Sequence, residues 1–197
     1  MTLVLNSSEI KKCVQLNEQL IPIIEDAFKS LALEKTTMPP ILRLDIEKYH
    51  GESDVKAAYI EGLDSYAIKV ASGFFNNPKL GLPSSNGLMI LLDSKTGVLK
   101  SVLLDKGYLT DVRTAIAGAI AAKHLSNPES SNVGIIGAGI QAKMQLEALL
   151  LVRNIKSAYV WSRNSKKTNT FVENLKGKIN IKINACESPE ETVNSSE

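Results

Sequence analysis

Two periodicities of apolar residues divide the first part of the chain into helices and strands. From Glu18 to Leu33 the apolar positions recur at intervals of three and four residues, which predicts a helix with one buried face. A brief helix over Glu9–Val14, capped by Ser7 or Ser8, is expected before it. Short apolar or alternating runs predict strands. The expected strands are Leu3–Leu5, Ile41–Ile46, Val55–Glu61, Tyr66–Ser72, Leu88–Leu92 and Val98–Leu104.

The pattern changes in the last part of the chain. An alanine-rich helix is expected over Leu109–Leu125, with Thr110 or Asp111 as its cap, and its small residues predict close packing against a neighbour. Alternation of strands and helices predicts a parallel sheet. We therefore expect an α/β protein with an N-terminal α+β domain (1–130) and an incomplete Rossmann domain (131–197). The alternating elements are Val133–Ile136, Gln141–Leu151, Ala158–Ser162, Lys166–Leu175 and Ile179–Ile183.

Composition narrows the class of protein. A net charge of +2 favours neither nucleic acid nor an acidic membrane surface, and an aromatic content of 5% argues against base-stacking platforms. Cys13 and Cys186 are far apart in sequence and form no metal-binding spacing, so we expect two reduced thiols and no metal. The first residues lack the pattern of a signal peptide, and no apolar run reaches the length of a membrane span. A cytoplasmic protein is expected.

A glycine-rich turn joins a short apolar strand to a helix. Gly137 permits a tight turn out of the strand, and Gly139 removes a side chain where backbone must approach a pyrophosphate. Ala142 is small enough for close packing of the helix on the strand. The first N–H groups of the helix then favour an anion. A turn made for packing alone is the alternative. The pattern predicts a nucleotide site formed by Gly137, Ala138, Gly139, Ile140, Gln141 and Ala142.

The second strand of this motif bears on the choice between NAD and NADP. An NAD site usually ends this strand with Asp or Glu, about 20 residues after the glycines. Here the strand ends in Trp161, Ser162, Arg163 and Asn164, with no acid. Arg163 can pair with a 2′-phosphate, with Ser162 and a neighbouring lysine (166 or 167) beside it. We expect Ser162, Arg163 and Asn164 to contact NAD or NADP, and favour NADP; a solvated charge at the strand end is the alternative for Arg163.

Three cations in the remainder of the chain stand out by their context. Lys69 lies in the middle of a strand between Ile68 and Val70, where a solvated charge is unexpected. Arg113 lies in the first turn of the alanine-rich helix, where a cation opposes the helix dipole unless an anion is bound. Arg43 is flanked by apolar residues in its strand. Surface or ion-paired cations are the alternative interpretation of all three.

Three segments closely resemble the ornithine cyclodeaminase/mu-crystallin family. They are Tyr66–Gly87, Leu109–Ala115 and Gly137–Ala142, and they occur in the family's order. The resemblance extends over essentially the whole chain. In detail, Asn76–Asn86 and Gly107–Thr110 are most similar to the ectoine-utilisation branch.

The resemblance implies a substrate and dimerisation domain, a Rossmann domain, a homodimer and an amino-acid substrate. In the cyclodeaminase reaction, NAD⁺ accepts a hydride from the α-carbon of a diamino acid. The distal amine attacks the resulting imine, ammonia leaves, and the hydride returns to give a cyclic imino acid such as proline. We therefore expect an ornithine cyclodeaminase-like enzyme, an ammonia-lyase. An NAD(P)H-dependent ketimine reductase, an amino-acid dehydrogenase and a non-catalytic ligand-binding protein are the alternatives.

The same resemblance implies roles for four residues. By motif position, Arg43, Lys69 and Arg113 would hold the substrate carboxylate, and Lys69 would also lie near the reacting carbon as the catalytic residue. Ser84 matches a family position often occupied by Thr in the same pocket. Arginine suits this task because its planar fork grips a carboxylate. A partly buried lysine near other cations can lose its proton and act as an acid or base.

The sequence departs from the family at its C-terminal end. The family's longer chains carry a catalytic aspartate in the distal Rossmann half, and no residue here matches it. Glu187, Glu190 and Glu191 are the nearest acids, and we interpret them as solvated charges at a helix start. We expect a truncated member that is inactive and poorly stable alone, because an unfinished parallel sheet exposes an apolar edge.

Overall fold

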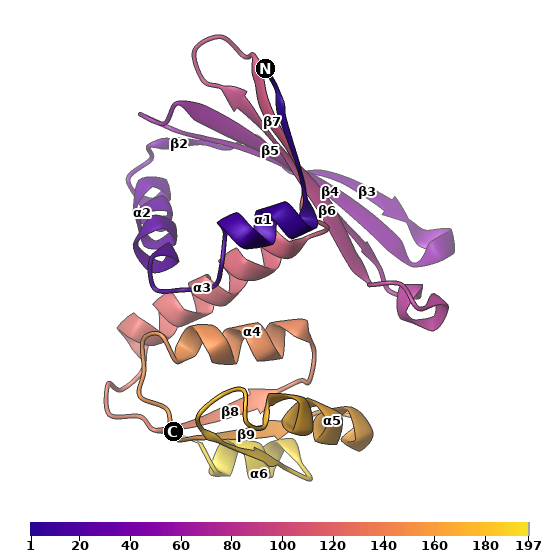
Figure 1. The fold of residues 1–197 in the computed structure, drawn as a ribbon, viewed down its shortest axis with the longest axis vertical. Helices are drawn as coiled ribbons and strands as arrows, with labels where there is room; N and C mark the ends of the chain where they lie inside the picture. The colour runs from indigo at the N-terminus through magenta and orange to yellow at the C-terminus, as the bar shows by residue number, and fades with distance from the viewer. Residues whose placement is uncertain (197) are drawn as a thin grey trace. The chain divides into compact units, whose positions relative to one another are not determined.

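The computed structural model describes residues 1–196, which form two compact units (Figure 1). The first unit comprises Met1–Gln15 and Asp26–Thr110, and the second comprises Leu16–Glu25 and the chain from Asp111 onward. The chain changes unit three times: after Gln15, within α2 (Leu20–Ala32) and near the start of α3 (Tyr108–Leu125). The domain boundary expected at residue 130 stays a prediction, because these units are divided at other positions.

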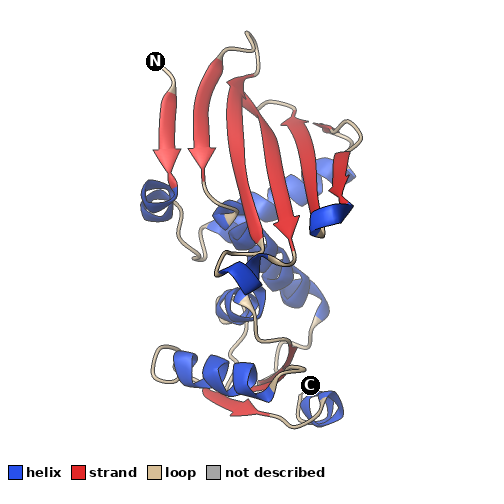
Figure 2. Ribbon diagram, turned by 90° about the vertical axis from the view of Figure 1, so that its right-hand side faces the viewer, coloured by secondary structure: helices blue, strands red, loops and turns tan. Residues whose placement is uncertain are grey.

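The first unit contains a seven-stranded sheet of order β1-β7-β6-β5-β4-β2, with β3 also paired to β4 (Figure 2). Only β1 and β7 pair in parallel; the other pairs are antiparallel. Every strand expected in this part of the chain is present, and β6 and β7 form a hairpin. The bounds are β1 Leu3–Asn6, β2 Thr36–Thr37, β3 Leu42–Ile46, β4 Gly51–Ile60, β5 Ser65–Phe74, β6 Ser85–Asp93 and β7 Leu99–Leu104.

The two faces of this sheet differ in chemistry. Cross-strand register places six ionisable residues of β3, β4 and β5 on one face, because paired residues share a face and neighbours along a strand alternate. We call it the polar face; on these strands it carries Arg43, Asp45, Glu52, Asp54, Lys56 and Lys69. The other face, the apolar face, carries Val4, Leu42, Leu44, Val55, Val70 and Leu104. Val4, Leu42 and Leu44 are 57%, 62% and 56% exposed, so this surface lacks a cover within the described residues.

The helix caps of the first unit differ from those expected. Helix α1 (Ser7–Cys13) begins at Ser7, and the Asn6 side chain accepts hydrogen bonds from the N–H groups of Ser8 and Glu9 at 2.9 and 3.1 Å. The Glu9 carboxylate accepts in return from the Asn6 N–H at 2.8 Å, completing a capping box. Ser7 and Ser8 are therefore not the caps, because the helix starts two residues earlier than its apolar pattern indicates.

Helix α3 is likewise capped from further upstream. The buried Asp105 carboxylate accepts from the Leu109 N–H at 2.8 Å. Thr110 and Asp111, the expected caps, lie inside the first turn because the helix begins at Tyr108.

Two short 3₁₀ helices, η1 (Glu47–Tyr49) and η2 (Asn77–Leu80), occupy the loops after β3 and β5. None of the helices in residues 1–196 combines the length and apolarity needed to cross a membrane.

The second unit contains a three-stranded parallel sheet of order β10-β9-β8, as the alternating pattern predicts. This is the order of the first half of a dinucleotide-binding fold. Its core is formed by Leu146, Ala158, Val160, Phe171 and Leu175. The elements are β8 Asn132–Ile136, α4 Ile140–Leu149, β9 Ser157–Trp161, α5 Ser165–Leu175, β10 Lys182–Ala185 and α6 Pro189–Asn194.

Helices α3 and α4 pack closely, as the small residues of α3 predict. Ala115, Ala119 and Ala148 are all buried at their contact. A side chain on Gly118 would displace the Gln145 amide, because an added Cβ would lie 1.8 Å from the Gln145 Oε1 atom. The Gln145 amide donates instead to the carbonyl of Thr114 on α3 at 3.1 Å.

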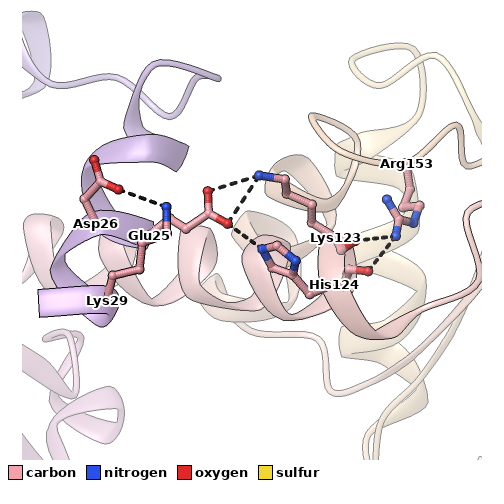
Figure 3. Close-up of polar contacts among 7 residues, drawn as sticks. Glu25, Asp26, Lys29, Lys123, His124 and Arg153 are labelled. Atoms are coloured by element: carbon pink, nitrogen blue, oxygen red, sulfur yellow. Dashed lines mark hydrogen bonds and ion pairs between the residues drawn. The ribbon is translucent and has the colours of Figure 1, made fainter. Parts of the chain in front are cut away.

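The C-terminal end of α3 is held by side chains (Figure 3). The Arg153 guanidinium donates to the carbonyls of Ala122, Lys123 and Ser126 at 2.8, 2.9 and 3.1 Å. The Ala122 carbonyl also accepts from the Ser126 N–H at 3.0 Å. A cation at this end adds donors to the last carbonyls and interacts favourably with the helix dipole. The Glu25 carboxylate of α2 accepts from Lys123 Nζ at 3.0 Å and contacts His124 Nε2. Lys123 and His124 thus both contact the Glu25 carboxylate at the helix end.

We expect Arg153→Ala to lower the free energy of unfolding by about 1.5–3 kcal/mol, because it leaves carbonyls at the end of α3 without their charged donor. Thermal and urea unfolding followed by circular dichroism measure this loss. The control is Arg163→Ala, which removes an exposed arginine and should change stability by less than about 0.5 kcal/mol. Equal stability of the two variants would contradict the capping role of Arg153.

Candidate functional site

The glycine turn leads from β8 into α4 with the geometry that the motif requires. Gly137 has φ +126°, a conformation that side-chain-bearing residues rarely adopt, and its N–H donates to the carbonyl of Trp161 at 2.7 Å. Gly139 is the N-cap of α4, with φ −102° and ψ −170°, and no described side chain caps this helix end. The first-turn N–H groups of α4 are therefore left for an external acceptor.

Gly139 faces open space. An added Cβ would have no heavy atom within 4 Å, although φ at this position is accessible to any residue. The absence of a side chain here is thus not required by packing or by backbone strain within the described residues. A ligand that approaches the backbone closely is a sufficient reason for glycine, and a pyrophosphate on a helix N-terminus is such a ligand.

A cavity of about 610 Å³ lies at the carboxyl ends of β8 and β9. In parallel sheets this edge is where ligands bind. The cavity adjoins the glycine turn on one side and the loop after β9 on the other. Its lining is Ile136, Gly137, Ala138, Gly139, Trp161, Ser162, Arg163, Asn164 and Lys167. The structure thus brings together six of the nine residues expected to bind the cofactor.

Two residues of the loop after β9 maintain its shape. The Ser162 hydroxyl shares a hydrogen bond of 2.8 Å with the buried Thr168 hydroxyl and donates to the Asn164 carbonyl at 3.1 Å. The Asn164 side chain caps α5 by accepting from the Lys167 N–H at 3.1 Å. Arg163 lies between them and is exposed. Arg163 and Lys167 are therefore the cationic groups that this cavity offers to a phosphate.

The other three expected cofactor residues are oriented differently. The Gln141 side chain turns toward α3, where its amide donates to the Asp111 carboxylate at 2.8 Å. Only the backbone of Gln141 is therefore left for the nucleotide site. Ala142 packs against the core of the second unit, as expected from its size. Ile140 is 66% exposed.

In the first unit, Arg43 is ion-paired. Its guanidinium donates to Asp45 at 3.0 Å and to Glu52 at 2.6 Å, and lies 3.8 Å from Asp54. The hydrogen bonds to Asp45 and Glu52 raise the pKa of Arg43 above its ordinary value. The alternative of an ion-paired cation therefore describes Arg43 in this structure, and a substrate carboxylate would compete with three protein carboxylates.

Arg43 and Lys69 lie on the same polar face, whereas Arg113 belongs to the second unit. Asp54, opposite Arg43 in register, lies on β4 between Glu52 and Lys56. Lys69 is half-buried on β5, and Arg113 is exposed on α3. The half-buried Ser84 lies just before β6, and its carbonyl accepts from the Phe74 N–H at 2.8 Å, which closes the loop after β5.

The charged neighbours of these cations were not evident from the sequence. Glu52, Asp54 and Lys56 alternate along β4, so all three share the polar face with Arg43 and Lys69. Lys56 Nζ lies 3.0 Å from an Asp54 oxygen. The spacing of two residues was visible in the sequence, but its meaning depends on which strands pair.

The model of the ornithine cyclodeaminase/mu-crystallin family matches residues 1–197. A Sinorhizobium fredii protein named an uncharacterized cyclodeaminase is 51% identical over 191 residues, which cover 96% of this chain and 58% of that protein.

Two solved structures share the fold closely. One is the Δ(1)-pyrroline-2-carboxylate reductase of Thermococcus litoralis in complex with NADH and L-proline, with a TM-score of 0.93 and 35% identity, over 99% of this chain and 60% of that one. The other is an archaeal alanine dehydrogenase dimer with bound NAD, with a TM-score of 0.87 and 32% identity, over 96% of this chain and 57% of that one. This chain thus spans less than two thirds of each relative. The chain belongs to the ornithine cyclodeaminase/mu-crystallin family.

Proposed function

We propose that the protein catalyses hydride transfer between a pyridine nucleotide and the α-carbon of an amino or imino acid. The observation that carries this proposal is the glycine turn, which leaves the first-turn N–H groups of α4 without protein partners beside a cavity at the ends of β8 and β9. In this proposal the backbone of residues 137–142 holds the pyrophosphate. The nucleotide, when bound, supplies the hydride chemistry.

The substrate would bind through the cations of the family motifs. We propose that Lys69 and Arg113 contact its carboxylate, with Arg43 and Ser84 in the same pocket, and that Lys69 exchanges a proton at the reacting centre. In the oxidative direction the α-carbon gives up a hydride and its nitrogen loses a proton, which leaves an imine. The residues described here orient the carbon and move the proton.

Two outcomes of this chemistry remain candidates. Cyclodeamination of a diamino acid is favoured by the motif resemblance and by the cyclodeaminase name of the Sinorhizobium fredii relative. Net reduction or dehydrogenation is favoured by the likeness to a pyrroline-2-carboxylate reductase and an alanine dehydrogenase. Incubation with ornithine, alanine or proline and NAD⁺ or NADP⁺ separates them. Release of ammonia with a cyclic product and no net formation of NAD(P)H indicates a cyclodeaminase. Net formation of NAD(P)H indicates a dehydrogenase. Binding without turnover indicates a ligand-binding protein.

We expect Gly139→Val to abolish detectable binding of NADH and NADPH without lowering stability, because the added side chain meets open protein space but blocks the approach of a pyrophosphate. Gly137→Val, in contrast, should lower the unfolding free energy by about 1–2 kcal/mol because of its positive φ. Nucleotide fluorescence titration and thermal unfolding measure both effects. Unchanged nucleotide binding by Gly139→Val would refute the proposed site.

We propose NADP as the preferred cofactor, because Arg163 and Lys167 line the cavity and the end of β9 offers no carboxylate for a ribose hydroxyl. Arg163→Ala should weaken NADPH binding about tenfold or more and change NADH binding much less, because only NADPH carries the 2′-phosphate. Lys178→Ala, at an exposed lysine elsewhere in the same unit, is the control. An equal effect on both nucleotides would argue against a 2′-phosphate contact.

We further propose a homodimer in which the apolar face of the first sheet packs on a second copy. Its exposed residues Val4, Leu42 and Leu44 form an uncovered apolar surface, and the alanine dehydrogenase neighbour is a dimer. Leu44→Lys should convert the dimer to monomer in size-exclusion chromatography with light scattering, because it places a charge in the interface. Leu125→Lys, at an 85% exposed leucine of the second unit, should not. A monomeric wild-type protein would refute this arrangement.

A further inference from the structure

Two lysines face each other across neighbouring strands of the first sheet. Lys56 of β4 is paired in register with Lys69 of β5, and Lys69 is paired on its other side with Met89 of β6. Directly opposed residues on antiparallel strands have Cβ atoms about 4.5–5.5 Å apart, and like charges in such pairs are destabilising. Two ammonium-bearing side chains thus arise from one small area of the polar face.

The polar-face carboxylates of β3 and β4 lie to one side of this lysine pair. Asp45 and Glu52 accept hydrogen bonds from Arg43. Asp54 is shared: one oxygen lies 3.0 Å from Lys56 Nζ, and the other, 3.8 Å from Arg43 Nη1, is buried without a hydrogen-bond partner among the described residues.

The polar-face residues next to Lys69 on β5 and β6 are uncharged, and Asp93 lies on this face at the far end of β6. The neighbours of Lys69 on these strands are alanine, glycine, methionine and leucine residues. These are Ala67, Ala71, Gly73, Gly87, Met89 and Leu91. A ligand held at Lys69 therefore lies beside a second ammonium group and these uncharged side chains, while the Asp54 carboxylate of the adjacent strand is ion-paired to Lys56.

We infer that Lys56 is a further substrate-binding residue, which selects amino or imino acids whose side chain carries no ammonium group. This inference rests on the proposed function, in which Lys69 contacts the substrate carboxylate. Lys56 then lies next to the remaining part of the substrate. A neutral ring or a second carboxylate is accommodated there, whereas the side-chain ammonium of a diamino acid is repelled. The substrate class is that of net reduction or dehydrogenation, since cyclodeamination requires a second amine.

The test measures ligand preference in the protein saturated with NADH or NADPH. L-proline, L-aspartate and L-ornithine are titrated by calorimetry against wild type, Lys56→Gln, Lys56→Glu and a control, Lys100→Gln. Lys100 is a matched control because it is 42% exposed and ion-paired to a strand aspartate, as Lys56 is at 40% exposure. Wild type should bind proline or aspartate about tenfold more tightly than ornithine, and Lys56→Glu should shift the ratio about tenfold toward ornithine.

Each outcome decides between the two proposals. If Lys56→Gln and the control both fold and neither changes the ratio of proline to ornithine affinity, the inference fails while the proposed function stands. Preference of the wild type for ornithine also overturns the inference. If wild type binds neither nucleotide, both proposals fail together. Should Lys56→Glu not fold beside Glu52 and Asp54, the neutral Lys56→Gln variant decides the question by its loss of discrimination.

Discussion

The position of the glycine turn depends on the close contact between helices α3 and α4. Ala115, Ala119 and Ala148 allow the two backbones to approach, and Gly118 leaves room for Gln145. Polar side chains of α4 then bond to α3, Gln145 to the Thr114 carbonyl and Gln141 to Asp111. The N-terminus of α4 is therefore fixed by packed helices and not by the loop alone, which is the arrangement that gives a binding site a defined geometry.

The polar face of the first sheet holds many charges on adjacent strands, where like charges repel one another. Three cations, at positions 43, 56 and 69, are matched by three carboxylates, at positions 45, 52 and 54. The overall charge is thus balanced, so the sheet forms without strong repulsion. The arrangement is uneven, since the carboxylates gather near Arg43 on β3 and β4. The charges can cancel over these three strands and still be unequal near Lys56 and Lys69, because Coulomb interactions weaken with distance.

Elements that depend on local periodicity were predictable from the sequence, and those that depend on pairing were not. The glycine turn, the parallel order of its strands and the small-residue contact of α3 follow from patterns within one segment. The caps by Asn6 and Asp105 were missed because a cap is defined by where the helix begins. The last strand begins at Lys182 and not at Ile179, which instead forms an isolated bridge with Lys176.

The candidate site likewise has a part that was predictable from the sequence and a part that was not. Most residues of the nucleotide cavity could be named in advance because they belong to two short segments, the glycine turn and the end of β9. The opposition of Lys56 and Lys69 could not, because a shift of one residue between β4 and β5 would move one lysine to the other face. The loop after β9 has a shape that does not depend on its exposed arginine. Its shape is maintained by Ser162, Thr168 and Asn164, so the exposed residue between them, Arg163, bears little of the fold's stability. In the proposed nucleotide site, a change at this one residue would therefore alter the choice between NADH and NADPH while the scaffold stays intact.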